Sequence, residues 1–350
     1  MADYRRHLIL SSSSIRDALG RLNSLASDAI LFVCTESDVL LGSLTDGDVR
    51  RGLLAGKVLD DSVTTIIQPN PKFFCAASTP FEELLRYREE NYRIIPVIDA
   101  NSRKINGVIN FRRQISYVPV DVVIMAGGQG MRLRPLTEKV PKPMLKIGDK
   151  PIIQHCMEHL GKYGAVNIWL SVNYLSEQII DYFGNGADFN LNVNYVREES
   201  AMGTIGSCSL VSQWKHDVVV ICNADVLTNV DIERWYIQFI HDNADISIVS
   251  IPYTVRVPYA ILEMDQNRVA AIREKPDYTY LANGGFYMIK RGLLDLLPSG
   301  HVDAPDFISY LISKGFRVTS FQHQGYWLDI GRIEDFERAQ MNYQTMINSK

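Results

Sequence analysis

The chain has 350 residues, with 36 lysines and arginines against 40 aspartates and glutamates, and a formal net charge of −4. This length predicts two domains, and the charge gives no reason to expect nucleic acid or an anionic membrane as a partner. The five cysteines form no C-x-x-C motif and no apolar run approaches a membrane span, so we expect buried thiols in a soluble, cytoplasmic protein.

Residues 1–117 contain an approximate internal repeat. Segments 29–56 and 93–114 each combine an apolar strand, an acidic turn, a second strand with a glycine (Gly42 or Gly107) and a polar helix start. Tandem units of this kind predict two similar folds packed together, at about residues 1–60 and 61–117.

The repeat resembles a tandem CBS pair, or Bateman module, a family that commonly binds adenine nucleotides between its repeats. The first half carries GSLTDGD from Gly42 to Asp48, which matches the family's G-x-x-T-x-x-D, whereas the second half departs from it. The resemblance therefore implies one adenine nucleotide pocket at most, around Thr45 and Asp48. A packing or dimerising module without a ligand stays equally open, because an aspartate at a turn before a helix is also a cap.

A short linker at residues 117–121, which contains Pro119, leads into a second module that we expect to span residues 118–350. Its first strand, at 122–125, is apolar and delivers the chain to a glycine cluster at the carboxyl end, where α/β sheets bind ligands. Glycines let an anion approach backbone N–H groups. Five basic residues follow, and they predict a phosphate-sized anion as ligand: Arg132, Arg134, Lys139, Lys142 and Lys146.

The two familiar glycine-loop motifs do not fit this stretch. Pro135 argues against the long helix that a dinucleotide fingerprint opens, and the Gly-Lys-Ser/Thr of a P-loop is missing from the segment. The string from Met125 to Leu145 instead resembles the opening signature of the sugar-1-phosphate nucleotidyltransferases, A-G-G-x-G-x-R-L-x-P-L-T followed by P-K-P-M. The resemblance extends over residues 120 to about 340. It implies an α/β fold with a Rossmann-like, open, mixed sheet that is GT-A-like, and the alternating strands and helices agree.

One short motif in this module suggests a different chemistry. Residues His155 to His159 satisfy H-x-x-E-H, a zinc-protease pattern. The surrounding segment, however, reads as an amphipathic helix with Ile152, Met157 and Leu160 on its apolar side. We therefore interpret the histidines as lying on or beside the outer face of a structural helix.

The resemblance implies transfer of a nucleotidyl group to a sugar 1-phosphate with release of pyrophosphate. The attacking phosphate oxygen is already ionised, so the site needs cations and a metal ion rather than a protein nucleophile. Asp225 and Asp329 match positions where the family binds Mg²⁺, although each alone also reads as a turn or capping residue. Arg132 would hold the β- and γ-phosphates, and Lys142 would reach between the α-phosphate and the sugar phosphate.

Further residues match the substrate-binding positions of the family. The matches to nucleotide-binding positions are Ala126, Gly127, Gly128, Gly130, Glu198, Gly203 and Thr204. The matches to positions that bind the sugar and its phosphate are Glu274, Lys275, Asn283 and Gly285. Tyr259-Ala260 occurs where many relatives have Tyr-Gly, which is a departure in the region of the sugar contacts.

Base and sugar are predicted from resemblance as well. The string MGTIG at 202–206 resembles the L-G-T-A-G of mannose and heptose guanylyltransferases more than the thymidylyltransferase pattern, and Glu198 or Glu199 would accept the guanine protons. A CBS pair ahead of such a transferase resembles the glucosamine-1-phosphate guanylyltransferases of bacterial legionaminic acid pathways. We therefore expect GTP and glucosamine 1-phosphate as substrates of a homo-oligomer.

Other readings stay open. Mannose or glucose 1-phosphate could replace glucosamine 1-phosphate, and dTTP or CTP could replace GTP. A nucleotide-sensing protein with an inactive transferase half is the alternative of another class.

Overall fold

The computed structural model describes residues 4–75 and 79–348. The chain divides into two compact units, one comprising the chain up to Pro119 with Gly161–Gly164, the other comprising Val120–Leu160 and the chain from Ala165 onward. Within the described ranges, no helix is both long and apolar enough to cross a membrane. All five cysteines are free and buried, as the sequence indicates.

The first unit contains two halves with one plan. In the first half, α1 (Ile15–Leu25) precedes the antiparallel strands β2 (Ile30–Cys34) and β3 (Leu40–Thr45), β1 (Leu8–Leu10) pairs with β2, and α2 (Asp46–Leu54) follows. In the second half, α3 (Phe81–Glu89) precedes the antiparallel strands β4 (Ile94–Ile98) and β5 (Ile105–Asn110). Gly42 pairs with Val33 and Gly107 with Val97, and the register shifts directly after each pair. The sequence repeat therefore corresponds to a repeated, irregular hairpin.

The two halves of this unit share buried apolar residues. Phe32 and Leu40 of the first half form one cluster with Ile94 and Ile105 of the second half. A separate cluster lies between α1 and its own sheet, around Ile15 and Leu22. Each such buried side chain contributes about 1.5–3 kcal/mol to the stability of the fold. The shared cluster therefore couples the stability of the two halves.

Asp48 is buried at the start of α2, where it closes a capping box with Thr45. The Thr45 hydroxyl donates to Asp48 Oδ2 at 2.6 Å, and the Asp48 amide donates back to Thr45 Oγ1 at 3.4 Å. Gln68 donates to Asp48 Oδ1 at 2.9 Å, and Arg51 forms an ion pair with it. Burial raises the pKa of Asp48, but the hydrogen bonds outweigh it and lower the pKa below the usual value.

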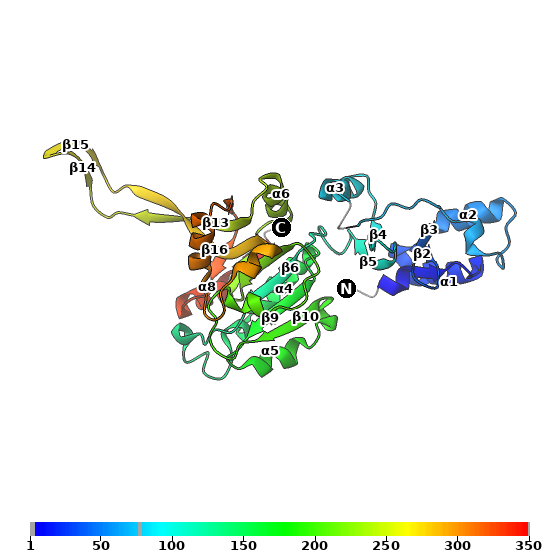
Figure 1. The fold of residues 1–350 in the computed structure, drawn as a ribbon, viewed down its shortest axis with the longest axis horizontal. Coiled ribbons are helices and arrows are strands. Elements are labelled where there is room, and N and C mark those ends of the chain that lie inside the picture. The colour runs from blue at the N-terminus through cyan, green and yellow to red at the C-terminus, as the bar shows by residue number, and fades with distance from the viewer. Residues whose placement is uncertain (1–3, 76–78, 349–350) are drawn as a thin grey trace. The chain divides into compact units, whose positions relative to one another are not determined.

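The second unit is built on a seven-stranded sheet with strand order β10-β9-β6-β11-β16-β13-β17 (Figure 1). All neighbouring strands are parallel except β16, which runs antiparallel to β11 and β13. The strands are β6 (Asp121–Met125), β9 (Asn167–Val172), β10 (Asn192–Arg197), β11 (Val218–Asn223), β13 (Ile246–Arg256), β16 (Asp277–Lys290) and β17 (Val318–Gln322). The predicted α/β fold with a mixed sheet is confirmed.

In the described part of this unit, five α-helices accompany the sheet: α4 (Ile152–Lys162), α5 (Ser176–Phe183), α6 (Ile232–His241), α7 (Ala304–Ser313) and α8 (Ile333–Asn348). α4 buries Ile152, Met157 and Leu160, which is the apolar side that the sequence predicts. Three short pairs complete the unit: β7 (Lys146–Ile147) with β8 (Lys150–Pro151), β12 (Val226–Thr228) with β18 (Trp327–Asp329), and β14 (Ile261–Asp265) with β15 (Arg268–Arg273).

The central strands explain where ligands can be held. β6 is buried from Asp121 to Ile124, and β11 from Val218 to Cys222, because both are apolar strands covered on both faces. Polar or flexible residues follow at their carboxyl ends, where β6 leads into the glycine loop and β11 ends at Asn223. Since the two strands are parallel neighbours, their carboxyl ends lie side by side.

We expect Asp48→Asn to destabilise the start of α2 by about 1–3 kcal/mol at pH 7. The substitution removes the buried carboxylate that accepts from Thr45 and forms the ion pair with Arg51. Folding lowers the pKa of Asp48, so its contribution is present above the usual value of 3.8 and is lost as the pH falls through the folded pKa. Hydrogen exchange of the α2 amides in the full chain, at pH 7 and pH 3, measures this. The exposed Asp46→Asn is the control, and an equal effect of both variants at pH 7 contradicts the assignment.

Candidate active site

The glycine loop after β6 is shaped by close contacts that exclude side chains. Gly130 has a φ of 61°, and a Cβ there would lie 2.9 Å from Thr137 Cγ2 and 3.0 Å from Lys142 Cβ. Thr137 donates its hydroxyl to the Gly130 carbonyl at 2.8 Å. Gly130 therefore fixes the loop against the segment that carries Lys142, and Gly128 is left exposed.

Lys142, Asp225 and Asp329 meet at the carboxyl edge of the sheet. Lys142 Nζ donates to Asp225 Oδ2, and their side chains are only 12% and 22% exposed. β12 pairs with β18 so that Val226 faces Asp329, and the Ile330 amide donates to the Asp225 carbonyl at 3.0 Å. The structure thus brings together two carboxylates that are far apart in the sequence.

Arg132 borders the same cluster. A Cβ on Gly331 would lie 3.6 Å from Asp329 Oδ2 and 3.8 Å from Arg132 Nη1, so the guanidinium and the carboxylate flank one glycine. Arg132 itself is exposed on the short 3₁₀ turn Met131–Leu133 that follows Gly130. All four predicted catalytic residues therefore lie in one cluster. Lys142, Asp225 and Asp329 are partly buried, and the Arg132 guanidinium is on the solvent side.

The carboxylates in this cluster fit a divalent cation. Asp225 Oδ1 is buried without a hydrogen-bond partner. Burial and the negative charge of Asp225 raise the pKa of Asp329, against the opposing charges of Lys142 and Arg132. A hard cation would satisfy the orphaned oxygen and relieve the repulsion. Among the described residues, no group of three or more His, Cys, Asp or Glu could hold a metal, so water and phosphate oxygens would complete the coordination.

Glu198 lies beside the glycine loop, and both of its carboxylate oxygens accept hydrogen bonds from the protein. A Cβ on Gly127 would come within 3.0 Å of Glu198 Oε1. Ser171 donates to Oε1 at 2.5 Å, and the Met202 amide donates to Oε2 at 3.1 Å. Glu198 therefore orients the loop that follows it, with lone pairs left for a ligand. Glu199 is exposed.

The loop at 202–206 is fastened to the segment that leads into α7. The Val302 amide donates to the Met202 carbonyl at 3.0 Å, and the Ala304 amide donates to Thr204 Oγ1 at 2.7 Å. The Thr204 amide donates to Asp303 Oδ1 at 3.1 Å. Gly203 has a φ of 75°, and a Cβ there would lie 2.4 Å from the Val302 carbonyl oxygen. Gly203 and Thr204 thus anchor the loop, and their partner Asp303 is a residue that the sequence analysis missed.

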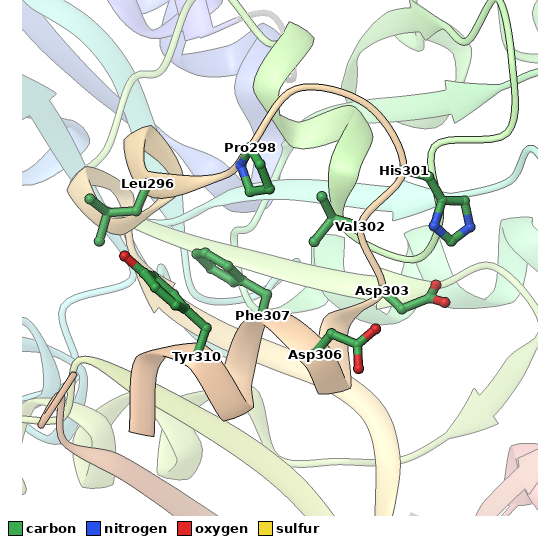
Figure 2. A pocket seen from close by; sticks show the side chains of 8 residues that line it. All are labelled: Leu296, Pro298, His301, Val302, Asp303, Asp306, Phe307 and Tyr310. Atoms are coloured by element: carbon green, nitrogen blue, oxygen red, sulfur yellow. The ribbon is translucent and has the colours of Figure 1, made fainter. Parts of the chain in front are cut away.

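Val302 and Asp303 also form one wall of a cavity of about 450 Å³. Figure 2 shows these two residues on the segment before α7, and Phe307 and Tyr310 on the helix itself. In this view the side chains of Leu296 and Tyr310 lie towards the left, and those of Asp303 and His301 lie towards the right. The segment before α7 therefore contacts the 202–206 loop and also lines this cavity.

Asn283 and Gly285 border the end of β11. Gly285 has a φ of 72°, and a Cβ there would lie 2.8 Å from Asn223 Nδ2. Asn283 donates to the Tyr287 hydroxyl at 2.8 Å and accepts from the Gly285 amide at 2.9 Å. Trp327 Nε1 donates to the Gly284 carbonyl at 3.1 Å. Asn223, Tyr287 and Trp327 are therefore further candidates, and the position of Asn223 at the end of an apolar strand is a signal that could have identified it.

Glu274 and Lys275 are the predicted site residues that the structure does not bring to this cluster. They lie between β15 and β16, with side chains that are 71% and 64% exposed and 3.9 Å apart. The histidines of the zinc-like motif have structural partners: His155 Nε2 bonds with the Ile147 carbonyl at 3.0 Å and His159 Nε2 with the Val230 carbonyl at 2.8 Å.

Thr45 and Asp48, the predicted nucleotide residues of the first unit, line a cavity of about 560 Å³ together with residues of the second half such as Tyr92 and Arg93. Their hydrogen bonds with each other form the cap described above. The cavity is therefore lined by both halves of the repeat, and the cap residues form part of its wall.

Comparisons with known proteins agree with this geometry. Residues 121–346 match the family model described as Nucleotidyl transferase. The chain is 30% identical over 227 residues to a mannose-1-phosphate guanylyltransferase of Mycobacterium tuberculosis, covering 63% of each chain. It is 30% identical over 233 residues to a D-glycero-alpha-D-manno-heptose 1-phosphate guanylyltransferase of Aneurinibacillus thermoaerophilus, covering 65% of this chain and all of that protein.

The chain is also similar to a protein of known structure. HddC from Yersinia pseudotuberculosis has a TM-score of 0.52 and 27% identity, covering 64% of this chain and 99% of that chain. Its complex with GMP-PN has a TM-score of 0.50 and 25% identity. This chain spans between about half and two thirds of the length of several curated relatives that it matches.

We expect Asp329→Asn to raise the free energy of unfolding of the second unit by about 0.5–2 kcal/mol in metal-free buffer at neutral pH. The raised pKa means that ionised Asp329 destabilises the fold above its folded pKa, and that this cost falls progressively as the pH drops from the folded pKa to the usual value of 3.8. Thermal unfolding in EDTA measures the change. Added Mg²⁺ should stabilise the wild type more than the variant.

The exposed Asp181→Asn on α5 is the matched control and should change stability by less than about 0.5 kcal/mol. A loss of stability in Asp329→Asn, with the same response to Mg²⁺ as the wild type, contradicts this account of the carboxylate pair.

Proposed function

Because this chain belongs to the nucleotidyl transferase family, we propose that it transfers GMP from GTP to a hexosamine 1-phosphate, giving a GDP-sugar and pyrophosphate. The observation that carries the proposal is the cluster of Arg132, Lys142, Asp225 and Asp329 beside the glycine loop. Joining two polyanions requires cations at their meeting point rather than a protein nucleophile. This cluster has that composition.

In this proposal each cation has a separate task. Arg132, on the exposed side, holds the β- and γ-phosphates and neutralises the leaving pyrophosphate. Lys142 stands between the α-phosphate and the sugar phosphate, and its contact with Asp225 keeps the ammonium in place. Pro141 and Pro143 are buried on either side of it, which lowers the ordering cost of the loop. Asp225 and Asp329 would hold Mg²⁺, which would supply positive charge to offset that of the phosphates.

The choice of GTP rests on the loop near Glu198. The relatives named above are guanylyltransferases, and one of the two HddC structures is a complex with GMP-PN. Glu198 lies next to Gly127, with both carboxylate oxygens oriented by Ser171 and Met202. A fixed carboxylate pairs with the adjacent N1 and amino protons of guanine, which adenine and uracil do not present together.

The choice of glucosamine rests on the architecture of the whole chain. A CBS pair before a transferase resembles the enzymes that make GDP-glucosamine for legionaminic acid and surface glycans. We propose that the first unit is such a pair, that its 560 Å³ cavity takes an adenine nucleotide, and that it contributes to dimerisation. The two irregular hairpins around Gly42 and Gly107 support the pair.

We expect Asp225→Asn to lower kcat/KM for GTP and glucosamine 1-phosphate at least about 100-fold, because the variant loses a metal ligand and the partner of Lys142. Pyrophosphate release, with and without EDTA, measures this. Asp217→Asn, on the exposed turn before β11, is the control and should retain wild-type activity. A kcat/KM within about threefold of wild type would remove Asp225 from the mechanism.

We also expect Glu198→Gln to lower kcat/KM for GTP by about 10–100-fold, the cost of losing a hydrogen bond to a charged acceptor. Inosine triphosphate, which lacks the 2-amino group, separates base recognition from loop support. The wild type should prefer GTP over inosine triphosphate, and the variant should lose this preference. If Glu199→Gln loses it instead, the neighbouring carboxylate reads the base.

A further inference from the structure

A further cavity of the second unit lies towards the amino ends of the strands, whereas the candidate active site lies at their carboxyl ends. The cavity has a volume of about 670 Å³, and it is lined by the first residues of β9 and β10 and by the segment before β11. None of the predicted site residues is among the described residues that line it. The cavity is therefore separate from the candidate active site.

Two rows of side chains from the sheet form the floor of this cavity. Asn167 of β9 pairs with Asn192 of β10, and Trp169 pairs with Asn194. Side chains two positions apart along a strand, and those of paired residues on neighbouring strands, lie on the same face of a sheet. The four side chains therefore project together, and β10 is the edge strand.

The opposite wall is the segment 212–215, which a buried carboxylate holds in place. Asp121, at the start of β6, is fully buried, and its Oδ2 accepts from the Lys215 amide at 2.7 Å. Asn167 donates its side-chain amide to Asp121 Oδ1 and accepts from Asn192 Nδ2 at 2.6 Å. One hydrogen-bond network thus fixes both the floor and the wall, so the cavity is formed by the protein itself.

Two tryptophans, Trp169 and Trp214, line the cavity. Both are partly buried and pack against the apolar cluster that includes Val123 and Ile221, so the core holds each indole in place. Trp169 Nε1 is buried and has no hydrogen-bond partner among the described residues, although a buried indole N–H usually has one. Such a donor fits a ligand that carries oxygen atoms.

Most of the other lining side chains are amides. Asn192 and Asn194 are partly exposed and Gln213 is exposed, and each amide offers a donor and an acceptor side by side. A sugar hydroxyl both donates and accepts, so neighbouring hydroxyls pair with such amides. The C–H groups on the face of a sugar ring also pack well against an electron-rich indole. Indoles beside amides therefore match a saccharide.

The charge of the cavity favours a neutral ligand. Among the described residues that line it, Lys215 is the one with a charged side chain, and it is exposed. A nucleotide also has a ring that stacks on indole, but its phosphates call for several cations or backbone donors. A neutral saccharide requires neither. The volume lies within the range of about 300–1,000 Å³ that is typical of small-molecule sites.

We propose that this cavity binds a neutral saccharide, with the indoles of Trp169 and Trp214 as packing faces and the amides of Asn192, Asn194 and Gln213 as partners of its hydroxyls. The inference does not depend on the function proposed above, because the residues of the active-site cluster take no part in it. Hydrolysis of a glycosidic bond uses a pair of carboxylates, and the described lining residues include none. The site therefore binds the saccharide without cleaving it.

Indole N–H signals in nuclear magnetic resonance spectra locate the ligand. The chain has four tryptophans, and Trp169→Phe and Trp214→Phe each remove one indole signal, which assigns it. Cellobiose, maltose and di-N-acetylchitobiose are the probes, each titrated into the isotope-labelled full chain without nucleotide. At least one should shift the signals of Trp169 and Trp214. Trp235, which is buried and donates to Ser247 at 2.9 Å, is the internal control and should not shift.

Variants in the same titration test the roles of the side chains. Trp214→Ala and Asn194→Ala should each raise the Kd of the disaccharide at least about tenfold. Trp214→Phe keeps an aromatic face and should raise it less than about threefold. Asn267→Ala, on the exposed turn between β14 and β15, is the matched amide control and should leave the Kd unchanged. Thermal unfolding checks that each variant is folded.

Four outcomes would overturn the proposal. A shift confined to Trp327, whose N–H donates to the Gly284 carbonyl, would place the sugar in the candidate active site. Absence of any shift with the three disaccharides would remove the saccharide. Shifts of Trp169 and Trp214 with guanosine but with no disaccharide would indicate a site for a base. An unchanged Kd in a folded Asn194→Ala would show that the amides do not bind the hydroxyls.

Discussion

The contact between Lys142 and Asp225 is the interaction on which the rest of the second unit depends. It joins the proline-flanked segment after the glycine loop to the end of β11, and β18 brings Asp329 to the same point through its pairing with β12. Opposite charges in a half-buried place attract more strongly than in water. The same place leaves Asp225 Oδ1 unpartnered and raises the pKa of Asp329, which are the features of a site built for charge from a ligand rather than for stability.

Much of this site follows from the sequence because its determinants are local or lie at strand ends. Glycines 127, 128 and 130 and the P-K-P segment lie within 17 residues of one another, and Asp225 follows an apolar run that predicts a buried strand. Asp303 and Ser171 were not predicted, because they act on the site through tertiary hydrogen bonds to Thr204 and Glu198. No local pattern encodes such a partner. Thr204, in turn, matches a nucleotide-binding position but uses its hydroxyl to hold Ala304.

The hairpin of β14 and β15 shows a different limit of the sequence. The sequence analysis identifies no element at Ile261–Asp265 or Arg268–Arg273, and strand pairing alone does not say which surface packs against such a hairpin. The first unit is the opposite case, because its repeat is visible in the sequence and reappears as two hairpins with the same register shift. There, Asp48 both closes the capping box of α2 and lines a cavity, so this residue has a structural role and a proposed functional one.

The measurement that tests the central claim most directly is a substrate matrix. Purified full-length protein with Mg²⁺ is given each of four nucleoside triphosphates with glucosamine, N-acetylglucosamine, glucose or mannose 1-phosphate, and released pyrophosphate is measured. The account predicts turnover with GTP and glucosamine 1-phosphate, and rates at least tenfold lower for the other pairs, as expected when a buried polar contact is missing. Turnover with another pair would correct the substrates. No turnover in any pair, with GTP still bound, would contradict the account and favour a nucleotide sensor.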